Sequence, residues 1–376
     1  MKEMTNRTVD TPEPDCGTPP LAAGYTPLRW YDPGEPPFRL AGLAWFHQHH
    51  RYRRMPLTPP GGLPEAVDFL ANCPAGGQVA FQSDTRRLEV RVALAGPADM
   101  SHMPATGQCG FDLYVGPPFA QRYCSTSMYD HRQTSYSAQL FDHLDGVLRN
   151  FALNFPLYQG VKELSIGLDP EAQVLPPPPY AVEGRIVVYG TSITQGGCAS
   201  RPGMAYTNVL SRALNIEIVN LGFSGSGKGE PEVARVVAEV SRPLLFVLDY
   251  EGNQDYEGLK ATLPKFIRIL RESHATVPIL VLSRIAFARD LTHEESRQTR
   301  ALCQDMQAQT VEALRRNGGR HIYFLDGSAL LGTDFDECTV DGVHPNDLGF
   351  MRMANALAPV VRRILGIPPG DSPPEA

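Results

Sequence analysis

The sequence predicts an α/β fold in which a doubly wound parallel sheet follows an antiparallel, β-sandwich-like domain. Two observations carry this prediction. Residues 184–367 alternate between short apolar runs and amphipathic stretches, a pattern typical of successive βα units. Residues 25–175 contain shorter runs in which every second residue is apolar. Turn residues separate these runs, and no strong amphipathic helix intervenes.

The length and the prolines agree with two domains. A chain of 376 residues corresponds to two or three domains at about 150 residues each. Four consecutive prolines at 176–179 predict a stiff linker over 176–183, because such a run cannot join a sheet. The polar, proline-rich ends predict disordered tails at 1–24 and 368–376.

Individual elements follow from the same patterns. In the first domain, period-two runs predict strands at 79–82, 88–94 and 110–115. In the second domain the predicted strands are 186–189, 216–221, 244–249, 279–285 and 322–325. The predicted helices are 204–214, 231–240, 259–272, 294–316 and 348–365. The strands of the second domain are almost continuously apolar, as expected when helices cover both faces of a sheet. A functional site is then expected at the carboxyl ends of the strands.

Charge and cysteine content restrict the partners. The net charge of −7 disfavours nucleic-acid binding, which needs a basic surface. No run of about 18 apolar residues predicts a membrane span, and the polar N-terminus does not resemble a signal peptide. The seven cysteines are scattered and form no C-x-x-C motif, which favours free thiols and a cytoplasmic location. The oligomeric state stays open.

Polar residues follow the predicted strands where a site is expected. Ser192 comes just after the first strand between glycines, as a nucleophile would, although a helix-capping serine fits the same position. Asn253 follows the third strand and offers an amide donor, or is an ordinary turn asparagine. After the fifth strand, Asp341 precedes His344 by three residues. This spacing lets the carboxylate accept the imidazole Nδ1–H.

The second strand ends in a glycine-rich stretch with two interpretations. Its glycines would let backbone N–H groups approach a ligand. Residues 222–228 also fit G-x-x-x-x-G-K, the start of a phosphate-binding loop, which would make the chain a nucleotide-binding protein. Gly229 argues against this alternative, because a phosphate-binding loop needs Ser or Thr there to hold magnesium.

Taken in order, the Ser, Gly, Asn and Asp-x-x-His segments resemble the SGNH (GDSL-type) hydrolase family over residues 184–365. The resemblance implies a flavodoxin-like catalytic domain with Ser192 as nucleophile, His344 as general base and acid, and Asp341 as its orienting partner. It also implies an oxyanion hole formed by the backbone N–H groups of Ser192 and Gly225 and the side-chain amide of Asn253. No cofactor and no metal is implied.

The chain departs from the family pattern at two positions. Thr191 replaces the usual Asp beside the nucleophile, and Gln254 replaces the usual Asp after Asn253. Neither position carries the assigned chemistry, so the departures indicate a divergent branch. The segments GFDLY at 110–114 and GTSITQGGCASRPG at 190–203 resemble a subgroup with an N-terminal G-x-D-L-Y β-domain, which extends the resemblance over residues 30–365.

The implied function is serine-dependent acyl transfer on a small-molecule or carbohydrate ester. An esterase would pass the acyl group to water, whereas an acyltransferase would pass it to the hydroxyl of a natural product. The subgroup resembled includes esterases, acetylhydrolases and an acyltransferase, so both outcomes are kept. The remote alternative is the nucleotide-binding protein described above.

Four other features have more than one interpretation. The His- and Arg-rich segment 46–54 could hold a metal, bind an anionic acyl donor or a substrate carboxylate, or form a solvated or interdomain face. Cys198 is expected to be a buried loop cysteine. Glu251 could shape the site or be a solvated acid. Asp112 and Tyr114 could reach the active site or only form a turn of the sandwich.

Overall fold

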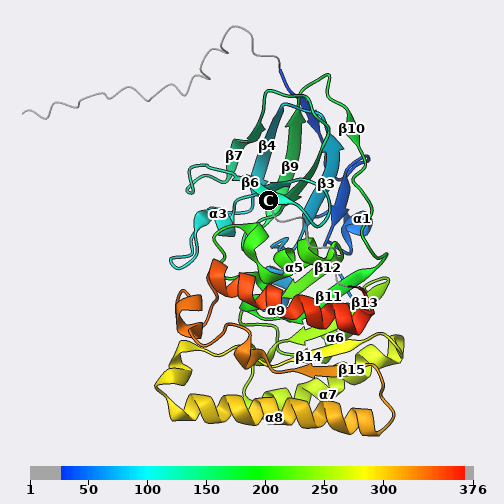
Figure 1. The fold of residues 1–376 in the computed structure, drawn as a ribbon, viewed down its shortest axis with the longest axis vertical. Helices are drawn as coiled ribbons and strands as arrows, with labels where there is room; N and C mark the ends of the chain where they lie inside the picture. The colour runs from blue at the N-terminus through cyan, green and yellow to red at the C-terminus, as the bar shows by residue number, and fades with distance from the viewer. Residues whose placement is uncertain (1–26, 369–376) are drawn as a thin grey trace, which may run out of the picture.

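The computed structural model describes residues 27–368, so the predicted tails lie outside the described residues except for Pro368. Figure 1 shows a β-structure at one end of the molecule and a helix-covered sheet at the other. Within the described range, no helix is both long enough and apolar enough to cross a bilayer.

The N-terminal part is a sandwich of two antiparallel sheets, as predicted. One sheet has the order β1-β9-β4-β7, formed by Arg29–Tyr31, Val161–Leu168, Arg87–Leu94 and Ser135–Asp142. The other has the order β10-β3-β8-β5-β6 with β2 beside β3, formed by Val174–Leu175, Gln78–Ser83, Arg149–Asn154, Asp112–Val115, Arg122–Thr126 and Arg39–Ala41. Phe81 and Phe151 of one sheet share a buried core with Val90 and Ile166 of the other. Short helices α1 (Phe46–His49), α2 (Glu65–Leu70) and α3 (Ala105–Gln108) lie in the connections.

The prolines at 176–179 separate the two folding patterns. Strand β10 ends at Leu175, and the first strand of the next sheet begins at Arg185. Arg39 donates a hydrogen bond to the carbonyl of Pro178 at 2.7 Å, so the sandwich holds this segment. The exact domain boundaries stay a prediction.

The C-terminal part is a five-stranded parallel sheet with the order β12-β11-β13-β14-β15, the doubly wound arrangement that the sequence predicts. Its strands in chain order are Arg185–Gly190, Glu217–Gly222, Pro243–Asp249, Ile279–Leu282 and Ile322–Leu325. The chain passes from β11 to β12 on one side of β11 and then from β12 to β13 on the other side. The strand order therefore reverses at β11, and a crevice is expected at the carboxyl ends of these strands.

Helices cover both faces of this sheet. On one face lie α6 (Pro231–Ala238), α7 (Tyr256–Ser273) and α8 (Glu294–Arg316). On the other lie α5 (Tyr206–Leu214) and α9 (Asp347–Leu365), side by side in Figure 1. Successive strand residues therefore enter different cores: Val187 packs under α6 and α7, whereas Val188 packs under α5 and α9. This two-sided burial explains the continuous apolar runs.

Short helical turns lie at the carboxyl edge of the parallel sheet and in the last loops. These are α4 (Ser192–Gln195) and the 3₁₀ turns Pro202–Met204, Glu251–Asn253, Ala288–Leu291, Gly327–Ala329 and Phe335–Cys338. Two of them carry predicted site residues, Ser192 and Asn253.

Candidate active site

Ser192 is the first residue of α4, immediately after strand β11. Thr191 stands before it in an extended conformation and its hydroxyl accepts the backbone N–H of Ile193 at 3.2 Å. Thr191 is therefore the helix cap, and the serine is left for another role. Gly190 must be glycine, because a Cβ there would stand 2.0 Å from Thr194 Oγ1 and 2.7 Å from the Asp249 carbonyl oxygen. The backbone N–H of Ser192, at the first helical position, has no acceptor within the helix.

His344 and Asp341 lie in the loop that precedes α9. Asp341 Oδ1 accepts the backbone N–H groups of Val343 at 3.0 Å and His344 at 2.8 Å, and its Oδ2 lies 2.7 Å from His344 Nδ1. Burial alone would raise the pKa of Asp341, but the hydrogen bonds from His344 and Val343 outweigh it and lower that pKa. The carboxylate is thus ionised near neutral pH and can only accept, so Nδ1 carries the ring proton.

Ser192 and His344 are brought together from opposite ends of the domain. The distance between Ser192 Oγ and His344 Nε2 is 2.8 Å. Because Nδ1 holds the ring proton, Nε2 has a free lone pair and the serine hydroxyl donates to it. Ser192, His344 and Asp341 therefore form a continuous hydrogen-bonded chain, which is the arrangement needed to activate a hydroxyl nucleophile.

Gly225 lies within the glycine-rich turn, residues 223–229, that follows strand β12, and Asn253 contacts this turn. Gly225 has φ +65°, and apart from its chain neighbours no described residue has an atom within 4 Å of the position its Cβ would take, so its backbone borders open space. The Asn253 side-chain amide donates to the carbonyls of Phe223 and Gly227, both at 3.2 Å. In this structure Asn253 holds the turn in place, and its role as an oxyanion donor stays a prediction.

The same turn does not have the geometry of a phosphate-binding loop. The backbone N–H groups of Ser226 and Gly227 both donate to the Phe223 carbonyl, at 3.0 and 2.9 Å. They are therefore committed within the turn and are not free to surround a phosphate. Strand β12 is also at the edge of the sheet.

Arg54 holds this turn from the sandwich domain, a role that the sequence pattern did not reveal. Its guanidinium donates to the carbonyls of Asn220 and Gly222 at the end of β12, and to those of Leu70 and Cys73. The side chain is fully buried and lies over the Phe223 ring. Burial lowers its pKa to about 10, so it remains charged at neutral pH.

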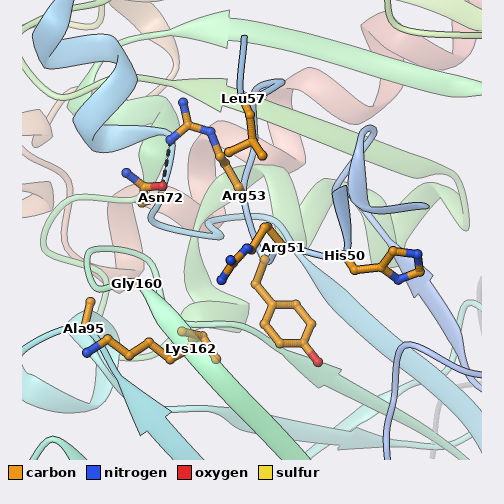
Figure 2. Close-up of a pocket in the computed structure, with 10 residues that line it drawn as sticks. His50, Arg51, Arg53, Leu57, Asn72, Ala95, Gly160 and Lys162 are labelled. Atoms are coloured by element: carbon orange, nitrogen blue, oxygen red, sulfur yellow. Dashed lines mark hydrogen bonds between the residues drawn. The ribbon is translucent and has the colours of Figure 1, made fainter. Parts of the chain in front are cut away.

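The rest of segment 46–54 is divided between surface and interior. Arg53, like Arg54, is buried, and it pairs with Asp68. Figure 2 shows His50, Arg51 and Lys162 around a pocket of about 350 Å³. The segment is thus partly an interdomain contact, as one alternative proposed. The anion-binding alternative stays a prediction for this pocket. Among the described residues, the histidines of this segment belong to no cluster with metal-ligand spacing.

The G-x-D-L-Y segment reaches the catalytic domain. Asp112, which is fully buried, accepts hydrogen bonds from Arg201 Nη1 and from the backbone N–H of Gly203, both at 2.8 Å. The Tyr114 hydroxyl lies 2.6 Å from Arg201 Nη1. These residues therefore fix the loop that follows α4.

Two further residues of the sandwich domain approach the Ser–His pair. The Tyr158 hydroxyl donates to the Ser192 carbonyl at 3.1 Å. The ring of His102 lies 5.9 Å from the ring of His344, measured between centroids. Both come from irregular segments whose sequence gives no periodic signal.

A cavity of about 630 Å³ opens beside these groups, between the two domains. It is lined by residues 101–104 of the sandwich domain and by Cys198, Ser200, Val340 and residues 346–348 of the catalytic domain. Cys198 itself is buried, as predicted. The cavity is large enough for a small organic molecule.

Glu251 is not a solvated acid. It is buried, and its Oε2 accepts the backbone N–H of Arg284 at 2.8 Å and the Gln307 amide at 2.7 Å. Glu251 thus ties the turn that carries Asn253 to the end of β14 and to α8.

Each of the two parts of the chain matches a known protein family. Residues 183–362 match the profile of the GDSL-like lipase/acylhydrolase family, and residues 28–174 match the profile of the N-terminus of SGNH-hydrolase-type esterases. No curated protein matches the chain with significance.

Solved structures share the whole architecture. A protein of Bacteroides ovatus classed as a GDSL-like lipase has a TM-score of 0.83 at 29% identity, over 90% of this chain and 98% of that one. The salicylyl-acyltransferase SsfX3 of a tetracycline biosynthetic pathway has a TM-score of 0.71 at 19% identity, over 92% and 99%. A family two carbohydrate esterase from Cellvibrio japonicus has a TM-score of 0.58 at 13% identity, over 90% and 98%. The last two likenesses show a common fold alone.

Proposed function

The chain belongs to the GDSL-like (SGNH) hydrolase family, and on that premise we propose that it is a serine esterase acting on O-acyl esters of small or carbohydrate-like molecules. The observation that carries the proposal is the hydrogen-bonded chain from Ser192 Oγ through His344 to Asp341, with distances of 2.8 and 2.7 Å. The predicted cytoplasmic location belongs to the proposal too, and it agrees with six free cysteines among the described residues.

In the first half-reaction the Ser192 oxygen attacks the ester carbonyl carbon while its proton moves to His344 Nε2. Asp341 holds Nδ1–H and stabilises the imidazolium. The backbone N–H groups of Ser192 and Gly225 and the amide of Asn253 donate to the oxyanion of the tetrahedral intermediate. Collapse of this intermediate breaks the ester C–O bond, and the leaving alkoxide takes the proton from His344.

In the second half-reaction His344 accepts a proton from water, whose oxygen attacks the acyl carbon on Ser192. The new intermediate collapses to free acid, and Ser192 recovers its proton from His344. The interdomain cavity would hold the substrate, because His102 lines it and the His102 ring lies 5.9 Å from the ring of His344. The sandwich domain then supplies one of its walls.

The test is a panel of acyl esters and acyl thioesters, scored for free acid and for transfer to added alcohols. A fluorophosphonate probe should label the wild type and not Ser192→Ala, and His344→Ala should lower turnover by several orders of magnitude. Ser101→Ala, in the wall of the same cavity, is the matched control and should still be labelled. Free acid as the main product supports the esterase. A transferred ester as the main product would favour the acyltransferase, and an unlabelled folded wild type would reject both.

A further inference from the structure

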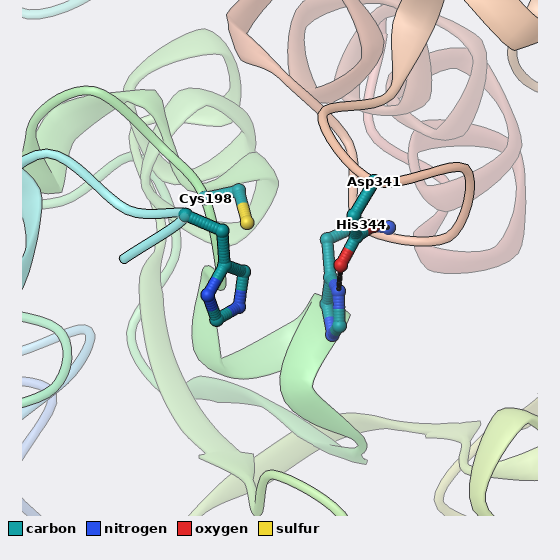
Figure 3. A group of neighbouring side chains, drawn as sticks. Cys198, Asp341 and His344 are labelled. Carbon is teal, nitrogen blue, oxygen red and sulfur yellow. Dashed lines mark hydrogen bonds and ion pairs between the residues drawn. The ribbon is translucent and has the colours of Figure 1, made fainter. Parts of the chain in front are cut away.

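Four side chains of the types that bind metals lie close together around the proposed active site, and one of them is the proposed general base. The cluster consists of His102 from the sandwich domain, Cys198 from the loop after α4, and Asp341 and His344 from the loop before α9. One ligand atom from each residue lies within 4.8 Å of those of the other three. Figure 3 shows Cys198 facing Asp341 and His344 across a short gap. The four residues come from three separate segments, and only the last two belong to the proposed triad.

The ligand atoms of these four side chains are sulfur, nitrogen and oxygen, a combination that favours zinc. Thiolate, imidazole and carboxylate are the groups that bind Zn²⁺ in tetrahedral protein sites. With about 2.3 Å to sulfur and about 2.0 Å to nitrogen or oxygen, ligand atoms around one ion are about 3.5 Å apart. The cluster must therefore contract by about 1 Å at its widest separation. His102 is exposed and can make that movement. Magnesium and calcium prefer oxygen ligands alone, so they do not fit.

The position of the cluster predicts what a bound ion would do. Both nitrogens of the His344 ring are already engaged, Nδ1 by Asp341 and Nε2 by Ser192. A zinc ion bound at either nitrogen displaces one of these partners. At Nδ1 the ion replaces the ring proton, which moves to Nε2, so the imidazole loses its orienting carboxylate and the lone pair that accepts the serine proton. At Nε2 the ion takes that lone pair itself, and the proton on Nδ1 stays. The adjoining cavity of about 630 Å³ gives the ion a route from solvent, because His102 and Cys198 line it.

We propose that His102, Cys198, Asp341 and His344 form a Zn²⁺ site whose occupation reversibly inhibits the enzyme. On binding, the Cys198 thiol forms the Zn–S bond and releases its proton to solvent. No oxidation state changes. The binding part stands on the cluster geometry alone, whereas the inhibition part rests on the proposed esterase function.

The test begins with binding to the full-length, metal-free protein. Titration calorimetry with ZnCl₂ should give one ion per chain. Co²⁺ should give the visible d–d bands of a tetrahedral site and a near-ultraviolet thiolate-to-cobalt band. His102→Gln and Cys198→Ser should each weaken Zn²⁺ binding by at least about tenfold, since even residues outside a ligand set change metal affinity by about 10- to 100-fold. Cys124→Ser and His131→Gln, which are exposed and outside the cluster, are the matched controls.

Inhibition is then measured as a fraction of each variant's own metal-free rate. Zn²⁺ should abolish wild-type ester hydrolysis, a chelator should restore it, and the inhibiting concentration should rise at least about tenfold in both cluster variants. Absence of stoichiometric binding, binding unchanged in both variants, or binding without inhibition would overturn the proposal. An inactive metal-free enzyme that still binds Zn²⁺ would instead reject the esterase function and leave the metal site standing.

Discussion

Asp112 and Arg201 form an ion pair across the domain interface, with 2.8 Å between Oδ2 and Nη1 and with the carboxylate fully buried. Asn154 donates to the other carboxylate oxygen at 2.8 Å, so both oxygens of Asp112 are engaged. The pair joins the sandwich to the loop that follows α4, the helix that begins at Ser192. Loss of this ion pair should therefore lower both the stability and the activity of the protein.

Asp112→Ala should lower the free energy of unfolding by about 3–5 kcal/mol, because it leaves the mostly buried Arg201 guanidinium without its partner. It should also lower kcat by about 10- to 100-fold through displacement of the loop. Denaturant unfolding and steady-state kinetics measure the two effects. Asp130→Ala, which breaks an exposed ion pair with Arg132, should change neither. Equal behaviour of the two variants would contradict a docking role for Asp112.

Arg54→Met should reduce kcat more than it changes KM. Arg54 holds the carbonyls at the end of β12, and the turn that they precede carries the predicted oxyanion donor Gly225. Arg54→Lys should give an intermediate rate, because one ammonium cannot replace a planar guanidinium that donates to four carbonyls. Arg86→Met, at an exposed position of the sandwich domain, is the control and should resemble the wild type. A normal kcat in a folded Arg54→Met protein would show that the residue has only a structural role.

Asn253→Ala should lower kcat by about 100- to 1,000-fold if the amide stabilises the oxyanion. Gln254→Ala is the control. Gln254 also donates to the glycine-rich turn, at the carbonyl of Lys228, so its loss loosens the turn without removing the predicted oxyanion donor. Gln254→Ala should therefore show only a small reduction. Similar losses in the two variants would assign Asn253 to holding the turn and not to the reaction.

Asp249 should make the protein less stable as the pH rises. Burial raises its pKa to about 7, although Tyr206 and Thr194 donate to its Oδ2 at 2.8 and 2.9 Å. The unfolded side chain has a pKa near 3.9, so between these values the folded state binds more protons and stability falls with increasing pH. From pH 5 to pH 8 this amounts to about 2–3 kcal/mol.

Asp249→Asn removes this titration, so its Tm relative to the wild type should increase between pH 5 and pH 8. Differential scanning calorimetry at both values measures the change. Asp305→Asn, on the exposed face of α8, should keep the same offset at both pH values. A constant offset for Asp249→Asn as well would mean that the buried carboxyl does not titrate in this range.

The regular elements were predictable because burial imposes a period on the sequence. Helix α8 and strand β15 have the predicted bounds. The strand predicted at 279–285 was too long, because β14 ends at Leu282, after which Ser283 and Arg284 bond to other loops. The helix predicted from residue 204 begins at Tyr206, since Pro202–Met204 forms a separate 3₁₀ turn.

The site was predictable where one domain's own strands supply it. The order of the strands brings Ser192, Asn253 and the loop of His344 to one edge of the sheet, where the sequence places the candidate site. Their catalytic roles stay predictions. Arg54, Tyr158 and His102 were not predictable in these roles. They come from irregular segments of the sandwich domain, and their positions depend on how the two domains dock. Docking of domains produces no periodic pattern of apolar residues in the sequence.

Strand β12 has a partner strand on only one side, since it ends the sheet order. Its outward carbonyls at Asn220 and Gly222 are occupied by Arg54, and the Glu217 side chain accepts the backbone N–H of Gly42 at 3.0 Å. The sandwich thus shields a strand edge that could otherwise recruit a strand from another copy of the chain. Separation of the domains would therefore expose an unpaired strand edge and would also remove the sandwich wall of the proposed active site.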